Sequence, residues 1–125
     1  MKKTSPLLLI PLIALLGCDR PTEPEPTTAD IRVVAAFTDR LGGVTVTCNP
    51  PGGTHPDPAS ACAALDTAGG DPERLVPLAV TCPDTHDPLW VAVEGSWGDT
   101  EFQLAWEFPN TCEARARSGG LVDLE

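Results

Sequence analysis

The sequence predicts one exported α+β domain in which most strands are antiparallel. Two observations carry this prediction. Apolar side chains alternate along several β-branched or aromatic segments, and two short segments begin with residues that cap helices. The chain has 125 residues, which is room for a single domain. Such a domain is small, so covalent cross-links between its cysteines would add significantly to its stability.

The first 17 residues have the features of a secretory signal. Lys2 and Lys3 precede an apolar run, residues 7–16, that is too short to cross a bilayer as a permanent helix. The run ends in Leu-Leu-Gly-Cys, which resembles the lipobox of bacterial lipoproteins. We therefore expect removal of residues 1–17 and lipidation of Cys18, which anchors the protein outside the cytoplasm. The alternative is an ordinary cleaved signal, a secreted protein, and a stray thiol at Cys18.

Removal of the leader also removes both lysines, so the formal net charge falls from −10 to −12. This acidity disfavours nucleic acid and anionic lipid surfaces as partners. Residues 18–30 are polar and rich in proline, and they are predicted to form an extended tether. The folded domain is expected to span residues 31–125.

Two β-branched segments open the domain, at residues 31–37 and 44–48. Residues 39–43 between them end in Gly-Gly and are predicted to form the turn of a hairpin. A helix is predicted next, because Asp57 can cap it and Pro58 suits its first position. Its body is rich in alanine up to Leu65, and Gly69-Gly70 supplies the stop.

The clearest hairpin lies in the second half of the chain. Leu, Val and Val alternate with other residues over 89–93, and four large apolar residues alternate over 102–108. Residues 95–98 are predicted to form the turn between these strands. Asn110, followed by Glu113, resembles a capping box that opens a helix ending at Arg117.

The last apolar run, residues 121–124, follows Gly119-Gly120 and is predicted to be a final edge strand.

The cysteines indicate disulfides. If Cys18 is lipidated, an even set of four remains: Cys48, Cys62, Cys82 and Cys112. Four cysteines allow three pairings, and the sequence pattern does not choose among them. Zinc is the competing interpretation, but the chain has no Cys-x-x-Cys pair and both histidines lie in Pro-rich turns. Disulfides fit an exported protein better.

The segment Cys82-Pro83-Asp84-Thr85-His86-Asp87-Pro88 is short, polar and bounded by prolines. Pro83 fixes its own φ and biases Cys82 toward extended backbone, and Pro88 does the same to Asp87. Such a segment is suited to presentation to a partner. By itself it would be read as an ordinary surface turn.

Several motifs occur together in a particular order. They are Gly53-Thr54-His55-Pro56, Ala68-Gly69-Gly70-Asp71, the proline-bounded segment, Val93-Glu94-Gly95-Ser96-Trp97 and Phe108-Pro109-Asn110-Thr111-Cys112. In this order they resemble the Streptomyces subtilisin inhibitor family of bacterial serine-protease inhibitors, over about residues 31–125. The resemblance implies a five-stranded antiparallel sheet with two helices on one face. It also implies the disulfides Cys48–Cys62 and Cys82–Cys112.

The resemblance further implies that the protein is not an enzyme, needs no cofactor or metal, and binds a serine endopeptidase. Asp84–Thr85 would be the reactive bond, and Asp84 would enter the primary pocket of the protease. Asn110 would support the loop from behind, and two copies would pair through a sheet face. The remaining loop residues would contact the protease: Cys82, Pro83, His86, Asp87 and Pro88.

Asp84 departs from the long side chains that are frequent at this position in the family. An ionised carboxylate in an apolar pocket loses its hydration at a cost of several kcal/mol. Two hypotheses follow: the target protease accepts an acidic residue, or binding to ordinary subtilisins is weak. The rival function is a non-inhibitory binding or structural surface lipoprotein that keeps the inhibitor fold.

Overall fold

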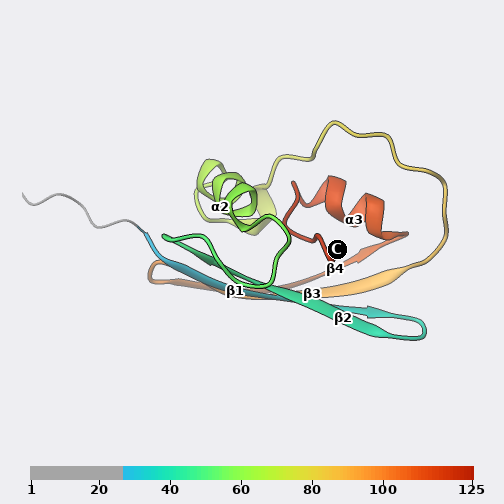
Figure 1. Cartoon of the computed structure of the whole chain (residues 1–125), viewed down its shortest axis with the longest axis horizontal. Coiled ribbons are helices and arrows are strands. Elements are labelled where there is room, and N and C mark those ends of the chain that lie inside the picture. Colours follow the sequence, from blue (N-terminus) through green and yellow to red (C-terminus); the bar gives the residue numbers. More distant parts are fainter. Residues whose placement is uncertain (1–26) are drawn as a thin grey trace, which may run out of the picture.

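The computed structural model describes residues 27–125. The predicted signal, the lipidation site Cys18 and most of the predicted tether therefore lie outside the described residues. The described part is an α+β domain whose strands form one antiparallel sheet in the order β2-β1-β3-β4 (Figure 1). The sheet has four strands, so the expectation of five is wrong.

The four strands form two hairpins whose first strands lie side by side at the centre. Residues 29–37 of β1 pair with β2 on one side and with β3 on the other, both antiparallel. β3 and β4 form the second hairpin. The bounds are β1 Ala29–Phe37, β2 Leu41–Cys48, β3 Leu89–Trp97 and β4 Thr100–Phe108. β1 thus begins two residues inside the segment predicted to be a tether.

The core lies against one face of this sheet, as the alternation in the sequence predicted. Side chains at every second position of the two central strands are fully buried, among them Ile31 and Val93. Of the aromatic residues of β4, Phe108 is buried in the core, and Phe102 and Trp106 pack at its margin. The inward-facing residues are Ile31, Val33, Ala35, Val44, Val46, Leu89, Val91 and Val93.

Both helices cover this apolar face, and the other face of the sheet carries none (Figure 1). α2 spans Pro58–Thr67 and α3 spans Thr111–Arg117, with a short 3-10 helix, η2, at Pro72–Arg74. The predicted caps are confirmed: Asp57 accepts a bond from Ser60 N, and Asn110 accepts one from Glu113 N. No helix within residues 27–125 is both long and apolar enough to cross a bilayer.

The two hairpin turns are tighter than predicted. β3 continues to Trp97, and the turn consists of Gly98 and Asp99, since Trp97 pairs directly with Thr100. Gly98 has φ 61, which the first position of such a two-residue turn requires and glycine adopts without strain. The other hairpin turns at residues 38–40, because pairing with β1 draws the glycines after Leu41 into β2.

The predicted edge strand at residues 121–124 is also wrong. Gly119 and Gly120, at φ 66 and 93, turn the chain inward after α3. Leu121 and Val122 are buried in the core. The backbone groups that a strand would use are taken by side chains, because Val122 N donates to Ser118 Oγ and the Leu121 carbonyl accepts from a histidine.

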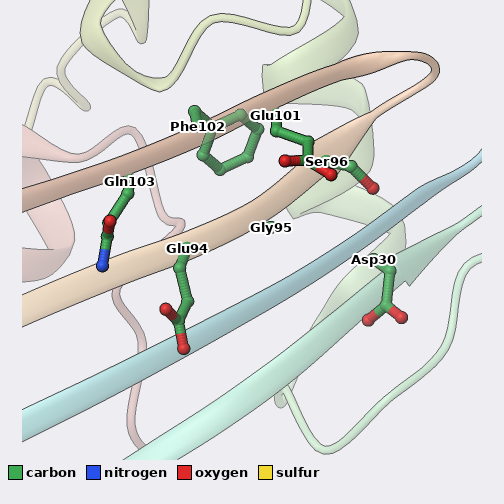
Figure 2. A pocket seen from close by; sticks show the side chains of 7 residues that line it. All are labelled: Asp30, Glu94, Gly95, Ser96, Glu101, Phe102 and Gln103. Atoms are coloured by element: carbon green, nitrogen blue, oxygen red, sulfur yellow. The ribbon is translucent and has the colours of Figure 1, made fainter.

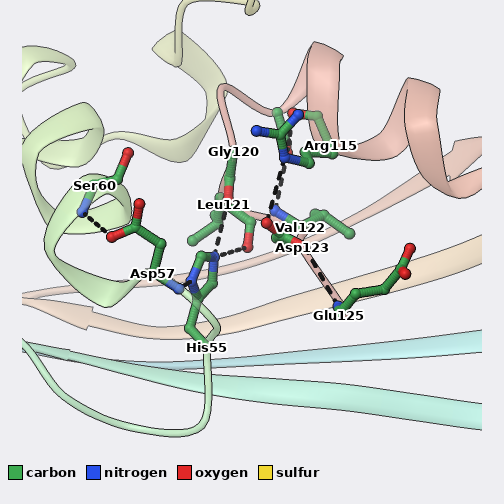
Figure 3. A network of polar contacts seen from close by, with 10 residues as sticks. His55, Asp57, Ser60, Arg115, Gly120, Leu121, Val122, Asp123 and Glu125 are labelled. Carbon is green, nitrogen blue, oxygen red and sulfur yellow. Dashed lines mark hydrogen bonds and ion pairs between the residues drawn. The ribbon is translucent and has the colours of Figure 1, made fainter. Parts of the chain in front are cut away.

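That histidine is His55, which ties the turn before α2 to the chain end (Figure 3). It is buried, and its Nδ1 accepts a bond from Asp57 N at 2.9 Å. The proton must then be on Nε2, which donates to the carbonyls of Gly120 and Leu121 at 2.9 and 3.1 Å. His55 is therefore a structural residue.

The two glycines after α2 have different surroundings. Both have positive φ, 69 for Gly69 and 80 for Gly70. A methyl group on Gly69 would meet nothing within 4 Å, whereas one on Gly70 would lie 2.2 Å from the indole of Trp97. The end of α2 and the end of β3 are thus in contact at Gly70.

These neighbours make a matched test of that contact. Gly69→Ala should reduce the free energy of unfolding by about 1–2 kcal/mol, the cost of an L residue at positive φ. Gly70→Ala should reduce it by about 1–3 kcal/mol more, because the indole must move. Urea denaturation of both oxidised variants measures the difference. Equal losses would show that Trp97 does not pack closely against Gly70.

Candidate functional site

The proline-bounded segment lies in a long irregular connection between η2 and β3. This connection loops out beyond α3 before it enters β3 at Leu89 (Figure 1). Residues 83–86 are exposed, and Asp87 and Pro88 are half-buried. We call residues 82–88 the presented loop. The loop is thus a protruding tip whose last residues turn back onto the domain.

The disulfide Cys82–Cys112 fixes the first residue of the presented loop. It joins Cys82 to the first turn of α3, with its Cα atoms 5.7 Å apart. The second disulfide, Cys48–Cys62, joins the end of β2 to α2. Both are the pairs that the resemblance implied, and they overturn the zinc interpretation of the cysteines. Cross-links over 30 and 14 residues each contribute roughly 3–4 kcal/mol on the chain-entropy model.

Asn110 contacts the middle of the presented loop from behind. Its side chain is 5 % exposed, and its Nδ2 donates to the Thr85 carbonyl at 2.7 Å. A weaker contact of 3.5 Å reaches the Pro83 carbonyl. The Oδ1 of the same side chain caps α3 by accepting from Glu113 N at 2.8 Å. One buried amide therefore joins the carbonyls of the loop to the start of a helix.

The C-terminal side of the loop is fastened to the same short segment. Asp87 N donates to the Pro109 carbonyl at 2.9 Å. Pro109, Asn110 and Cys112 thus hold the loop at three points, namely Asp87, Thr85 and Cys82. Because α3 packs on the core through its buried alanines, the loop takes its position from the core.

The Asp87 carboxylate makes a further contact that the sequence did not predict. It accepts a bond at 2.9 Å from Arg40, which lies in the turn between β1 and β2. The two residues are 47 positions apart in the chain. Only the pairing of β1 with β3 brings that turn beside the loop, so no local pattern could have indicated the contact.

The tip of the loop keeps its own polar groups available. Within residues 27–125, the backbone N–H groups of Asp84, Thr85 and His86 have no hydrogen-bond acceptor in the protein. The side chains of these three residues are exposed. A segment with free backbone donors and exposed side chains can pair with a partner as an added strand does.

A separate hollow lies at the other end of the sheet, on its uncovered face (Figure 2). Its volume is about 550 Å³, and three carboxylates line it: Asp30, Glu94 and Glu101. Three like charges disfavour an anionic ligand. Within the described residues, no group of three or more His, Cys, Asp or Glu side chains is placed to hold a metal ion. The presented loop is therefore the stronger candidate for the functional site.

The double role of Asn110 can be separated by substitution. Asn110→Asp keeps the oxygen that caps α3 but places a carboxylate against the Thr85 carbonyl. Asn110→Ala removes both functions and exposes the helix terminus, at a further cost of about 1 kcal/mol. We expect both variants to be nicked faster within residues 83–86 by a non-specific protease. Only the alanine variant should lose amide-exchange protection at Glu113.

Parent-like resistance of Asn110→Asp to nicking would contradict a supporting role for the Asn110 amide. Asp57→Ala, which removes the matching cap of α2 far from the loop, is the control for a general loss of stability.

Known proteins resemble this chain over most of the described domain. A family model described as "Subtilisin inhibitor-like" matches residues 27–110. Subtilisin inhibitor-like protein 1 of Streptomyces cacaoi is 40% identical over 83 residues, which cover 62% of this chain and 74% of that protein. A subtilase-type protease inhibitor of Streptomyces fradiae is 39% identical over 84 residues. These cover 65% of this chain and 59% of that protein, less than two thirds of its length.

A solved structure has the same fold. The crystal structure of Streptomyces caespitosus sermetstatin in complex with Bacillus licheniformis subtilisin matches with a TM-score of 0.54 and 28% identity. The match covers 78% of this chain and 96% of the other. The matched family region contains the presented loop and ends at Asn110, the residue that supports it. The chain therefore belongs to the subtilisin inhibitor-like family, whose members are protease inhibitors rather than enzymes.

Proposed function

We propose that this protein inhibits a subtilisin-type serine protease by presenting residues 82–88 as a substrate-like loop. One observation carries the proposal: Pro109, Asn110 and Cys112 hold the exposed loop at three points along its length. Membership of the family and the likeness to an inhibitor solved in complex with subtilisin support it.

The physical reason is preorganisation. A flexible peptide loses conformational entropy when a protease binds it, and this loss weakens binding. A loop already held in its bound shape loses little. It also stays in place after the peptide bond is cut, so the two new chain ends remain together and the bond can form again. Tight binding and slow net hydrolysis both follow from the same restraint.

The reactive bond in this proposal is Asp84–Thr85. Carried over from the family pattern, Cys82 and Pro83 precede the residue that enters the primary pocket, and His86 follows the bond. Asp84 is exposed at the loop tip, where a protease can reach it. An acidic residue at this place fits a protease whose primary pocket is basic or polar. In an apolar pocket the carboxylate would lose hydration without compensation.

Substitution of Asp84 tests the loop and its specificity together. Asp84→Met should tighten inhibition of subtilisin by about 100-fold or more, because it removes a desolvation cost of several kcal/mol. Asp84→Lys should create inhibition of trypsin. Inhibition constants against subtilisin and trypsin measure these two effects. A protease specific for acidic residues should be inhibited best by the unaltered protein.

Asp66→Met and Asp66→Lys are matched controls, since Asp66 is exposed on α2 and away from the loop. They should leave every inhibition constant unchanged. If neither Asp84 variant gained inhibition, the loop would not be inhibitory, and the protein would be a binding or structural module that keeps the fold.

We also propose that two copies pair through the uncovered face of the sheet, as the family resemblance implies. On this face, side chains of paired residues form rows that run across the four strands. Two adjacent rows are apolar except for Glu107 at one end. Leu41 and Trp90 in these rows are 78% and 48% exposed. An apolar surface of this kind is typical of an interface. The apolar sheet patch consists of Leu41, Ala36, Trp90, Gly43, Val34, Ala92 and Ala105.

Trp90 is the largest side chain of the apolar sheet patch, so its loss should weaken pairing most. Trp90→Glu should raise the dimer dissociation constant by about 100-fold or more, because a carboxylate would be buried without a partner. Sedimentation equilibrium over a range of concentrations measures this constant. Val76→Glu is the control, since Val76 is 67% exposed outside the patch. Equal dimer dissociation constants for the two variants would contradict pairing through this face.

The same proposal places the protein outside the cytoplasm, held to the membrane by lipid on Cys18 or secreted. Two disulfides suit an oxidising compartment, and the lipobox-like Leu-Leu-Gly-Cys supports the anchor. The mass of the protein extracted from membranes distinguishes the two forms. A diacylglyceryl adduct on Cys18 is expected, and an unmodified thiol at that residue would contradict the anchor.

A further inference from the structure

The turn between β1 and β2 is built around one arginine. Phe37 N donates to the Arg40 carbonyl at 2.8 Å, which closes the turn. The Arg40 guanidinium lies over the Phe37 ring, 3.8 Å from its centroid. Its Nη1 donates to Asp39 at 2.8 Å, and its Nη2 donates to Asp87 of the presented loop at 2.9 Å. The guanidinium is therefore oriented by its own turn toward the loop.

The hydrogen bonds to Asp87, and then to Asp39, raise the pKa of Arg40 above its already high ordinary value. The side chain is thus positively charged at neutral pH. Arginine also presents its donors in a fixed planar fork, so it can bond Asp39 and Asp87 at once. A lysine at this position would keep the charge but not the fork.

The contact falls on one particular side of the proposed reactive bond. The disulfide and the Asn110 amide hold the loop at Cys82, Pro83 and Thr85. Beyond Thr85, the hydrogen bond from Asp87 N to Pro109 and the Arg40 contact hold the chain before β3 begins. Cleavage of the Asp84–Thr85 bond leaves the new amine on Thr85. The part of the loop that follows this amine is thus held partly by Arg40.

The chemistry gives that side its importance. The protease serine oxygen bonds to the Asp84 carbonyl carbon, the bond to Thr85 nitrogen breaks, and the enzyme's histidine supplies the proton that the departing amine takes. In reverse, the amine attacks the acyl-enzyme, the peptide bond forms, and the serine regains its proton. Water competes with the amine for the acyl-enzyme. An amine kept close by a fixed chain wins this competition more often.

We propose that Arg40 is a positioning residue that keeps the Thr85 amine within reach of the acyl-enzyme, so that religation outcompetes hydrolysis. This inference rests on the proposed function. Arg40 and Asp87 are half-exposed, at 50% and 43% of their side chains, so the pair adds little to the stability of the fold. Its effect is expected in the partition between religation and hydrolysis.

The test uses the full domain in the Asp84→Met background with subtilisin. Arg40→Gln should increase the rate of net hydrolysis of the 84–85 bond by roughly three- to fivefold, the range open to an exposed charge pair. It should slow recovery of intact protein from the cleaved form by a similar factor. Cys82–Cys112 keeps the cleaved form together, because it joins the two sides of the cut. The melting temperature should change little.

Three further variants separate positioning from a general effect. Arg40→Lys should change the rates of hydrolysis and religation less than Arg40→Gln does, but should not match the parent, because lysine lacks the planar fork. Arg40→Gln should have no further effect on hydrolysis or religation once Asp87→Ala has removed the acceptor. Arg74→Gln, which removes an exposed arginine paired with Asp71 outside the loop, should behave as the parent.

The outcomes distinguish this inference from the proposed function. Inhibition by the parent with unchanged hydrolysis and religation in Arg40→Gln would overturn the role of Arg40 alone. A similar change in Arg74→Gln would do the same, because the effect would be one of net charge. No inhibition by the Asp84→Met parent would overturn the inhibitory function, and the role of Arg40 with it.

Discussion

The attachment of the presented loop to the start of α3 is the constraint on which the site depends. Asn110 and Cys112 are two residues apart, and both bond to the loop while α3 packs on the core. The amide of Asn110 is nearly fully buried and uses both of its ends, the oxygen on the helix and the nitrogen on the loop. A buried amide with all its partners in place is costly to disturb, because each lost bond leaves a desolvated polar group. The exposed tip therefore takes its rigidity from buried contacts.

The rest of the fold supports this arrangement. The central pair β1–β3 buries alternate residues, and β3 begins directly after the loop, so the sheet fixes where the loop must end. His55 and the two glycines after α3 bring the chain end under the helices, which completes the core beneath α3. The apolar sheet patch borders the presented loop at one end, because Leu41 follows Arg40 and Trp90 lies two residues beyond Pro88.

Local patterns in the sequence predicted most of the elements. Alternation over 102–108, the Asp57-Pro58 start of α2 and the Asn110 cap of α3 each reflect chemistry that acts within a few residues. The prediction of a fifth strand was wrong because a four-residue apolar run has no distinct period. The side chains of His55 and Ser118 form hydrogen bonds with its backbone groups instead. The pairing of the cysteines came only from the family resemblance. The Arg40–Asp87 contact could not be predicted from local patterns, since it depends on the register of strands far apart in the chain.

Whether the loop tip is rigid in the free protein can be measured directly by ¹⁵N relaxation of the backbone amides of Asp84, Thr85 and His86. Held by residues 109–112, these amides should have order parameters near about 0.85, as in the strands of the sheet. Values below about 0.6 at all three, with rigid strands in the same sample, would show that the loop is mobile and contradict inhibition by a preorganised loop.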